Sequence, residues 1–332
     1  MGGTLESRLM RLALKHAALV VLLLSIDLRA AAVMSPAGPP QTQPPARQKR
    51  WLVAHRGASA YAPENTVPAF RLAAEQGATF VEFDLRFTKD GQVVCLHDDS
   101  LERTTDVEEV FPDRSRPGAT AAAPRRWLLE DFTLAEVKRL DAGTWFDPKY
   151  RDTRIPTFAE TIDSLKGRSG LFIELKSPER YAGIEKMMLD ELKARGLDRP
   201  GADPRTPVLI QSFTASSLEI LTNTLKTPLP LHFLVGARDA APWVTPEGLA
   251  KVRSFATGLS PEKVIVRDNP DLMKRARQLG LLVTPYTFRA SAVTGYSDVR
   301  AEMTHYLDVL GVDGVITDNP DQMPPVKSTP TP

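Results

Sequence analysis

LVAHRGASAYAPENTVPAFRLAAEQGATFVEFDLRFTKDGQVVCLHDD, residues 52–99, joins two short apolar runs through a helical pattern. The runs predict strands at Leu52–Ala54 and Thr79–Arg86, and the pattern between them predicts a helix at Asn65–Gln76. A strand followed by a helix and a second strand is typical of a βαβ unit, in which the two strands lie parallel. The stretch therefore predicts an α/β protein built on a parallel sheet.

The same alternation continues to the end of the domain. We expect further strands at Leu171–Leu175, Val208–Ser212, Leu231–Val235, Ala256–Leu259, Leu281–Tyr286 and Gly314–Ile316. We expect further helices at Thr157–Lys166, Ile184–Ala194, Ala215–Leu225, Pro246–Phe255, Pro270–Leu279 and Ala301–Leu310. About eight strand–helix units are typical of a TIM-type (β/α)8 barrel. An open, doubly wound sheet is the alternative, but it needs a topological switch point that the sequence does not show.

Residues from about 98 to 156 interrupt this alternation. They hold clusters of Gly, Pro, Arg and Ala around Pro117–Arg126, and one helical pattern near Leu134–Leu140. We interpret this segment as an insertion that follows the second strand and covers one end of the barrel.

The two ends of the chain differ from this domain. Basic residues at the N-terminus precede an apolar run at Ala17–Ile26 and small residues at Ala30–Ala32, which is the order of a signal peptide. The apolar run is shorter than the roughly 20 residues that span a bilayer. We therefore predict a signal peptide at 1–32, a Pro-rich linker at 33–50, the barrel at 51–323 and a disordered tail at 324–332. An uncleaved amphipathic helix or a membrane anchor is the alternative to export to the periplasm or the medium.

The charge balance bears on the class of partner. Lys and Arg number 42 against 41 Asp and Glu, so the chain lacks the basic excess that nucleic-acid binding usually needs. We expect a small-molecule substrate, no nucleic acid and no stable membrane span in the mature chain. The single cysteine, Cys95, excludes an intramolecular disulfide.

Three carboxylates on two predicted strands indicate a metal site. Glu82 and Asp84 lie two residues apart on one strand, so both point to the same face. Glu174 and Lys176 repeat this spacing on another strand. Inward carboxylates are costly unless a cation neutralises them, and three of them suit a hard divalent ion. Ca²⁺ is favoured by the expected export, and Mg²⁺ also fits; an edge strand with its acids in solvent is the alternative.

Two histidines follow predicted strands. His55 and Arg56 come directly after the first strand, at the end where (β/α)8 barrels carry their active sites, and His97 follows the run VVCL. Imidazole suits proton transfer near neutral pH. Phosphodiester hydrolysis needs such transfers and also positive charge on the phosphate oxygens. The alternative is that the histidines are structural, and that Lys176 merely extends from a strand end.

These motifs resemble the glycerophosphodiester phosphodiesterase family. The resemblance rests on HRGASAYAPENT, VEFDLRFTKDG, VVCLHDDSLERTTD, FIELK, RIPTFAE, VLIQSF, VTPYTFR and GVDGVITDNP, and the run after His97 is most similar to the exported bacterial subgroup. It implies a TIM-type barrel with an insertion after the second strand. It also implies metal-dependent hydrolysis of glycerophosphodiesters to glycerol 3-phosphate and an alcohol, by direct attack of water or through a cyclic phosphate.

The resemblance further implies a role for each residue of the site. The general acid and base are His55 and His97, the metal ligands are Glu82, Asp84 and Glu174, the phosphate is held by Arg56 and Lys176, and the substrate pocket is lined by Phe213 and Tyr286. Phe213 and Tyr286 can alternatively be barrel-rim packing. Thr317 and Asp318, after the last predicted strand, could touch the site, but we expect them to cap a turn. A phospholipase of the same superfamily and a non-catalytic binding protein on this fold are the alternative functions. No acidic or histidine position departs from the family pattern, which favours catalysis.

Overall fold

The computed structural model describes residues 50–118, 120 and 123–325, all within one compact unit. The predicted signal peptide lies outside these residues, as do all of the predicted linker except Arg50 and all of the predicted tail except Pro324 and Pro325. Their predicted boundaries therefore stay predictions. Among the described residues, none of the helices has the length and apolar character needed to cross a membrane.

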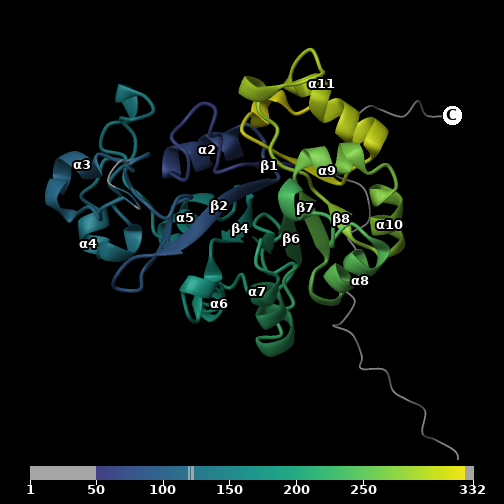
Figure 1. Ribbon diagram of the computed structural model, residues 1–332, viewed down its shortest axis with the longest axis horizontal. Helices are drawn as coiled ribbons and strands as arrows, with labels where there is room; N and C mark the ends of the chain where they lie inside the picture. Colours follow the sequence, from purple (N-terminus) through teal and green to yellow (C-terminus); the bar gives the residue numbers. More distant parts are fainter. Residues whose placement is uncertain (1–49, 119, 121–122, 326–332) are drawn as a thin grey trace, which may run out of the picture. The chain divides into compact units, whose positions relative to one another are not determined.

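Eight parallel strands form one sheet in the order β8-β7-β6-β5-β4-β2-β1-β9 (Figure 1). Their bounds are β1 Trp51–Ala54, β2 Phe80–Phe87, β4 Gly170–Leu175, β5 Val208–Ser212, β6 Leu231–Val235, β7 Gly258–Pro261, β8 Leu282–Val283 and β9 Gly314–Thr317. The amide of Asp313 donates to the Val283 carbonyl (2.8 Å), and that of Ile316 to the Pro285 carbonyl (3.0 Å). These bonds join the two ends of the sheet, so the strands nearly close into the predicted TIM-type barrel.

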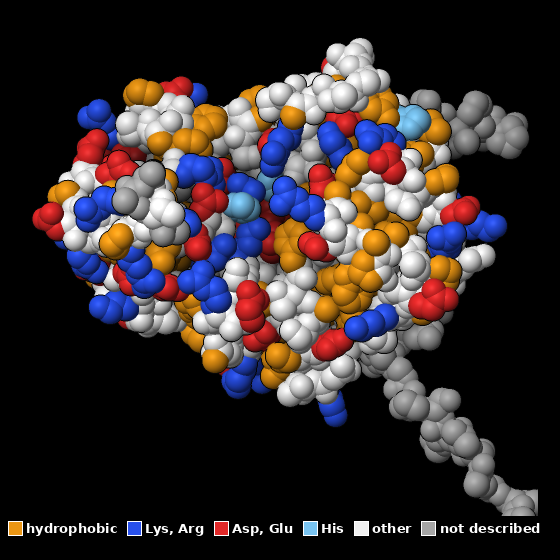
Figure 2. Space-filling model, in the orientation of Figure 1, with side chains coloured by type: hydrophobic (Ala, Val, Ile, Leu, Met, Phe, Trp, Pro, Cys, Tyr) orange, Lys and Arg blue, Asp and Glu red, His pale blue; other side chains and the backbone are white. Residues whose placement is uncertain are grey.

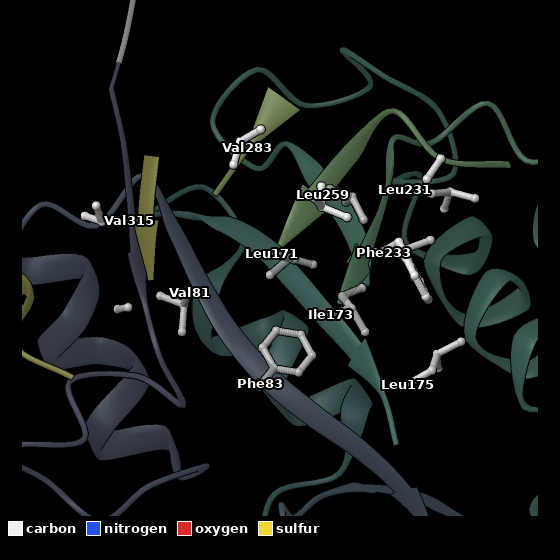
Figure 3. Packing of buried hydrophobic residues seen from close by; sticks show 14 of the residues in the cluster. Val81, Phe83, Leu171, Ile173, Leu175, Leu231, Phe233, Leu259, Val283 and Val315 are labelled. Carbon is white, nitrogen blue, oxygen red and sulfur yellow. The ribbon is translucent and has the colours of Figure 1, made fainter. Parts of the chain in front are cut away.

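Helices surround the strands (Figure 1). Apolar side chains on the outer faces of the strands pack against these helices. The bounds of the helices are α2 Val67–Glu75, α5 Phe158–Leu165, α6 Ile184–Ala194, α7 Ala215–Glu219, α8 Pro246–Phe255, α9 Lys263–Asp268, α10 Leu272–Gln278 and α11 Val299–Thr304, with π-helical turns at Ile220–Thr224 after α7 and His305–Leu310 after α11. The largest buried cluster lies between strands and helices. Figure 3 shows part of it, including Val81, Phe83, Leu171, Ile173 and Phe233. Side chains alternate along a strand, so Glu82 and Asp84 point into the barrel instead.

Several predicted bounds shift for local reasons. Helix α2 starts at Val67, two residues after the predicted start at Asn65. Asn65 has a φ of +55°, which no right-handed helix contains, and Thr66 has an extended backbone with φ -124° and ψ 157°. β8 covers only part of the predicted Leu281–Tyr286, since Pro285 has no N–H to donate to a neighbouring strand. Helix α9 was not predicted.

The chain leaves the barrel after β2 through an antiparallel hairpin with β3, Val93–Cys95. Residues 98–156 then form two short helices, α3 at Val107–Val110 and α4 at Leu134–Val137, and 3-10 turns at Pro112–Arg114, Leu129–Asp131 and Pro148–Tyr150. This segment has a small core of its own, which includes Leu101, Val107, Trp127, Leu129, Phe132, Val137 and Leu140. The insertion is therefore a packed unit anchored at the end of β2.

Candidate active site

The carboxyl ends of β1, β2 and β4 bring the predicted site residues together. Asp84 of β2 is the register partner of Glu174 of β4, so the two carboxylates lie side by side. Lys176 follows β4 directly, and His55 follows β1. Figure 2 shows Lys, Arg and His side chains gathered near the middle of this face of the molecule. The edge-strand alternative for the acids is wrong, because β2 is paired on both sides and all its residues are buried.

The three acids form a compact group inside the barrel. One oxygen from each of Glu82, Asp84 and Glu174 lies within 4.8 Å of the others, and all three side chains are buried. The Glu82 Oε1 atom has no hydrogen-bond partner among the described residues. Buried carboxylate oxygens in need of a partner fit a hard divalent cation. The donor set therefore could hold a metal ion.

The pKa values of these acids diverge. Burial, together with the charges of Asp84 and Glu174, raises the pKa of Glu82 well above its usual range. Burial raises the pKa of Glu174 to about 7, although Lys176 opposes the shift. Burial would also raise the pKa of Asp84, but Lys176, His97 and Arg56 together lower it. Asp84 therefore keeps its charge, while the other two acids are ionised at a free-energy cost that a bound cation would offset.

Two basic side chains flank the acids. The Nζ atom of Lys176 lies 2.7 Å from Glu174 Oε1 and 3.2 Å from Asp84 Oδ1. The backbone N–H of Arg56 donates to Glu82 Oε2 (2.8 Å), and its guanidinium Nε lies 3.6 Å from Asp84 Oδ2. Arg56 and Lys176 thus place positive charge on the rim of the acidic group, where a substrate phosphate could be bound.

Each histidine is held through Nδ1 by a carboxylate. His55 Nδ1 lies 2.6 Å from Asp318 Oδ1, and His97 Nδ1 lies 2.7 Å from Asp98 Oδ1. A carboxylate partner favours the tautomer with the proton on Nδ1, which leaves Nε2 for proton transfer. Burial, with the nearby Arg56 charge, lowers the pKa of His55 despite the opposing effect of Asp318. His55 therefore favours its neutral form.

A pocket of about 130 Å³ opens over this group. Its lining includes His55, Arg56, His97, Glu174, Lys176, Gln211, Phe213, Tyr286 and Arg289. The rings of Phe213 and Tyr286 meet edge to face with centroids 5.9 Å apart, so they form one apolar wall. Seven of the nine predicted site residues line the pocket, and the other two, Glu82 and Asp84, contact Arg56.

The sequence reasoning missed the residues that orient the site. Asp318 does not act as the expected turn cap: its carboxylate contacts His55 Nδ1 and, at 2.8 Å, Arg289 Nε. Thr317 makes the turn contacts, as predicted: its hydroxyl donates to the Phe288 carbonyl and accepts from the Asn319 amide. Asn65 belongs to the predicted helix but lies before the observed α2, and its side-chain amide donates to Asp84 Oδ2 (2.7 Å). The position of Asp318 directly after the last strand was the available signal, because that edge of a barrel carries the site.

Comparison with known proteins shows the family of this chain. The sequence matches the glycerophosphoryl diester phosphodiesterase family over residues 55–322. A glycerophosphodiester phosphodiesterase of Bacillus subtilis is 34% identical over 284 residues, covering 83% of this chain and 85% of the relative. One from Arabidopsis thaliana is 31% identical over 323 residues, covering 83% and 86%.

Solved structures show the same fold. A phosphodiesterase of Oleispira antarctica, in complex with the product sn-glycerol-3-phosphate, is similar with a TM-score of 0.63 at 26% identity, covering 82% of this chain and 94% of that one. A glycerophosphodiester phosphodiesterase of Agrobacterium tumefaciens has a TM-score of 0.61 at 25% identity, covering 82% and 98%. Fold and site together define a phosphoric diester hydrolase on a TIM-type barrel. Within that class, the chain belongs to the glycerophosphoryl diester phosphodiesterase family.

Proposed function

We propose that this enzyme hydrolyses glycerophosphodiesters to glycerol 3-phosphate and an alcohol, using a divalent cation and the histidines His55 and His97. The observation that carries the proposal is the meeting of three buried carboxylates with two carboxylate-bound imidazoles beside one pocket. The product bound to the Oleispira antarctica relative supports the same product here.

Glu82, Asp84 and Glu174 would hold the cation. Ca²⁺ is our preferred ion because we expect the enzyme to be exported, and Mg²⁺ is the competitor because it also binds carboxylates. The bound cation would supply positive charge to the non-bridging oxygens of the phosphate. Without a metal ion the three carboxylates repel one another, and a bound cation would attract all three. Metal binding would therefore stabilise the folded site.

The chain's own groups would bind the phosphate and move the protons. Arg56 and Lys176 lie on the rim of the pocket and would contact the phosphate oxygens as cations. His55 and His97 would each present Nε2, one removing the proton of the nucleophile and the other protonating the leaving alkoxide. Phe213 and Tyr286 would pack against the carbon atoms of the substrate.

A substrate panel tests this function. The protein should release glycerol 3-phosphate from a series of glycerophosphodiesters, lose that activity in excess EDTA, and regain it when Ca²⁺ or Mg²⁺ is restored. Turnover confined to intact phospholipids would assign the phospholipase activity instead. Binding without turnover of any ester would assign a non-catalytic role.

We also propose that the enzyme is exported and loses residues 1–32. The support is the basic, apolar and small-residue order at the N-terminus. N-terminal sequencing of protein recovered from the periplasm or medium tests this, and an intact Met1 there would contradict cleavage.

A further inference from the structure

Arg103, in the inserted segment, contacts two carboxylates at once. Its Nη1 and Nη2 atoms donate to the two oxygens of Glu64 at 2.9 and 2.7 Å, which is a bidentate pair. Its Nε atom donates to Asp98 Oδ2 at 2.5 Å. A guanidinium is planar and carries its donors in a fixed fork, so these contacts fix the two carboxylates relative to each other.

Each of the two carboxylates holds a different residue of the site. Asp98 uses its other oxygen, Oδ1, to bind His97 Nδ1 at 2.7 Å. Glu64 accepts from Arg56 Nη1 at 2.9 Å. The contacts therefore form one chain from His97 through Asp98, Arg103 and Glu64 to Arg56, in which carboxylates alternate with guanidinium groups.

The chain joins two parts of the fold that have separate cores. Arg56 and Glu64 belong to the loop between β1 and α2 of the barrel, whereas Asp98 and Arg103 belong to the segment after β3. Glu64 is mostly buried, with 14% of its side chain exposed, and Arg103 is 43% exposed. Burial raises the pKa of Glu64, but Arg103 and Arg56 lower it overall, so its carboxylate stays charged.

We propose that Arg103 is a positioning residue, which sets the distance and angle between the proton-transfer group His97 and the phosphate-binding Arg56. Its fork ties the inserted segment to the barrel at the point where both contribute to one pocket. The inference rests on the function proposed above, because it assigns Arg103 an effect only through those two residues.

We expect kcat and KM to respond differently on the two sides of Arg103, the Asp98–His97 contact and the Glu64–Arg56 contact. Asp98→Asn should lower kcat with little change in KM, because it disturbs the orientation of His97. Glu64→Gln should mainly raise KM, because it releases Arg56. Arg103→Gln should do both, lowering kcat by about 10- to 100-fold, the usual effect of losing a residue that orients a reactive group.

Two further variants separate the effect of the guanidinium geometry from that of its charge and from a general loss of stability. Arg103→Lys retains the charge but not the fork, so it should show most of the loss and not rescue activity. Arg116→Gln is the matched control, because Arg116 makes a bidentate pair with Asp131 in the same segment, at 2.7 and 2.6 Å. Its acidic partners, Asp131 and Glu130, are not residues of the site. It should keep wild-type kcat and KM. Thermal unfolding of all variants accounts for any general loss of folding.

Four outcomes would overturn the positioning role, three of them in single variants. They are near-normal kinetics for Arg103→Gln, full rescue by Arg103→Lys, or an equal kinetic loss in Arg116→Gln. A double variant Asp98→Asn/Arg103→Gln whose kcat loss equals the product of the single losses would also overturn it, because groups acting in one chain are not additive. The variant His97→Ala distinguishes failure of this inference from failure of the proposed function. If His97→Ala lowers kcat strongly while Arg103→Gln keeps near-normal kinetics, only this inference fails. If His97→Ala itself leaves turnover intact, the proposed function fails.

Discussion

Replacing Glu174 with Gln should stabilise the metal-free protein while weakening its response to metal. Burial raises the pKa of Glu174 from its ordinary value of 4.5 to about 7. The rise corresponds to about 3 kcal/mol, because one pKa unit is worth about 1.4 kcal/mol. The ionised carboxylate therefore costs the folded state this free energy at high pH, and a neutral isostere removes the cost.

The sign of the pH dependence follows from proton binding. Between pH 4.5 and 7 the folded state holds a proton on Glu174 that the unfolded state has released, so the stability of the wild type falls as pH rises through this window. Above pH 7 the loss is complete. The stability difference between Glu174→Gln and wild type should be small near pH 4.5 and approach about 3 kcal/mol by pH 8.

Urea unfolding in EDTA at pH 5 and pH 8 measures this difference, with a second series in Ca²⁺ or Mg²⁺. An ion at 100 times its Kd should stabilise the wild type by about 2.7 kcal/mol and the variant by much less, because one of three ligands is weakened. Glu75→Gln, at an exposed carboxylate on α2, is the control and should change neither series. The reasoning is refuted if the variant unfolds at lower urea than wild type in EDTA at pH 8, or if metal stabilises both proteins equally.

Two further predictions concern the histidines. His55→Ala and His97→Ala should each lower kcat by about 10²–10⁴, and the double variant should fall little further, because the pair acts as a unit. On a p-nitrophenyl ester, kcat should stay low only in the variant that lacks the general base, because nitrophenolate leaves without protonation. Near-normal kcat on a natural ester for both single variants would contradict the two-histidine mechanism. Asp318→Asn should lower kcat by roughly 10- to 100-fold at nearly constant KM, because His55 loses a charged acceptor at 2.6 Å. Steady-state kinetics with unchanged thermal unfolding checks this, and a change confined to KM would count against it.

The residue pattern within single segments predicted many of the strands and helices of the barrel. The predicted strands Val208–Ser212 and Leu231–Val235 and the helices Ile184–Ala194 and Pro246–Phe255 agree with the observed bounds. Alternation within one strand also placed Glu82 and Asp84 on a common face without any knowledge of their neighbours. The predicted bounds of an element were wrong where the backbone of a single residue departs from the hydrophobic pattern. Asn65 at the predicted start of α2 is an example, because its φ is positive.

The sequence by itself determined the parallel α/β architecture, the inward direction of the acids and the choice of His55 and His97 as candidates, because each depends on spacing within one or two segments. Only the tertiary structure decided which carboxylate holds which histidine. Asp318 lies 263 residues from His55, and the two meet because β9 pairs with β1 as the sheet closes. Arg103 likewise reaches Glu64 across 39 residues through the packing of a separate small core. Contacts of this kind depend on how distant segments pack against one another, and periodicity within a segment carries no information about that packing.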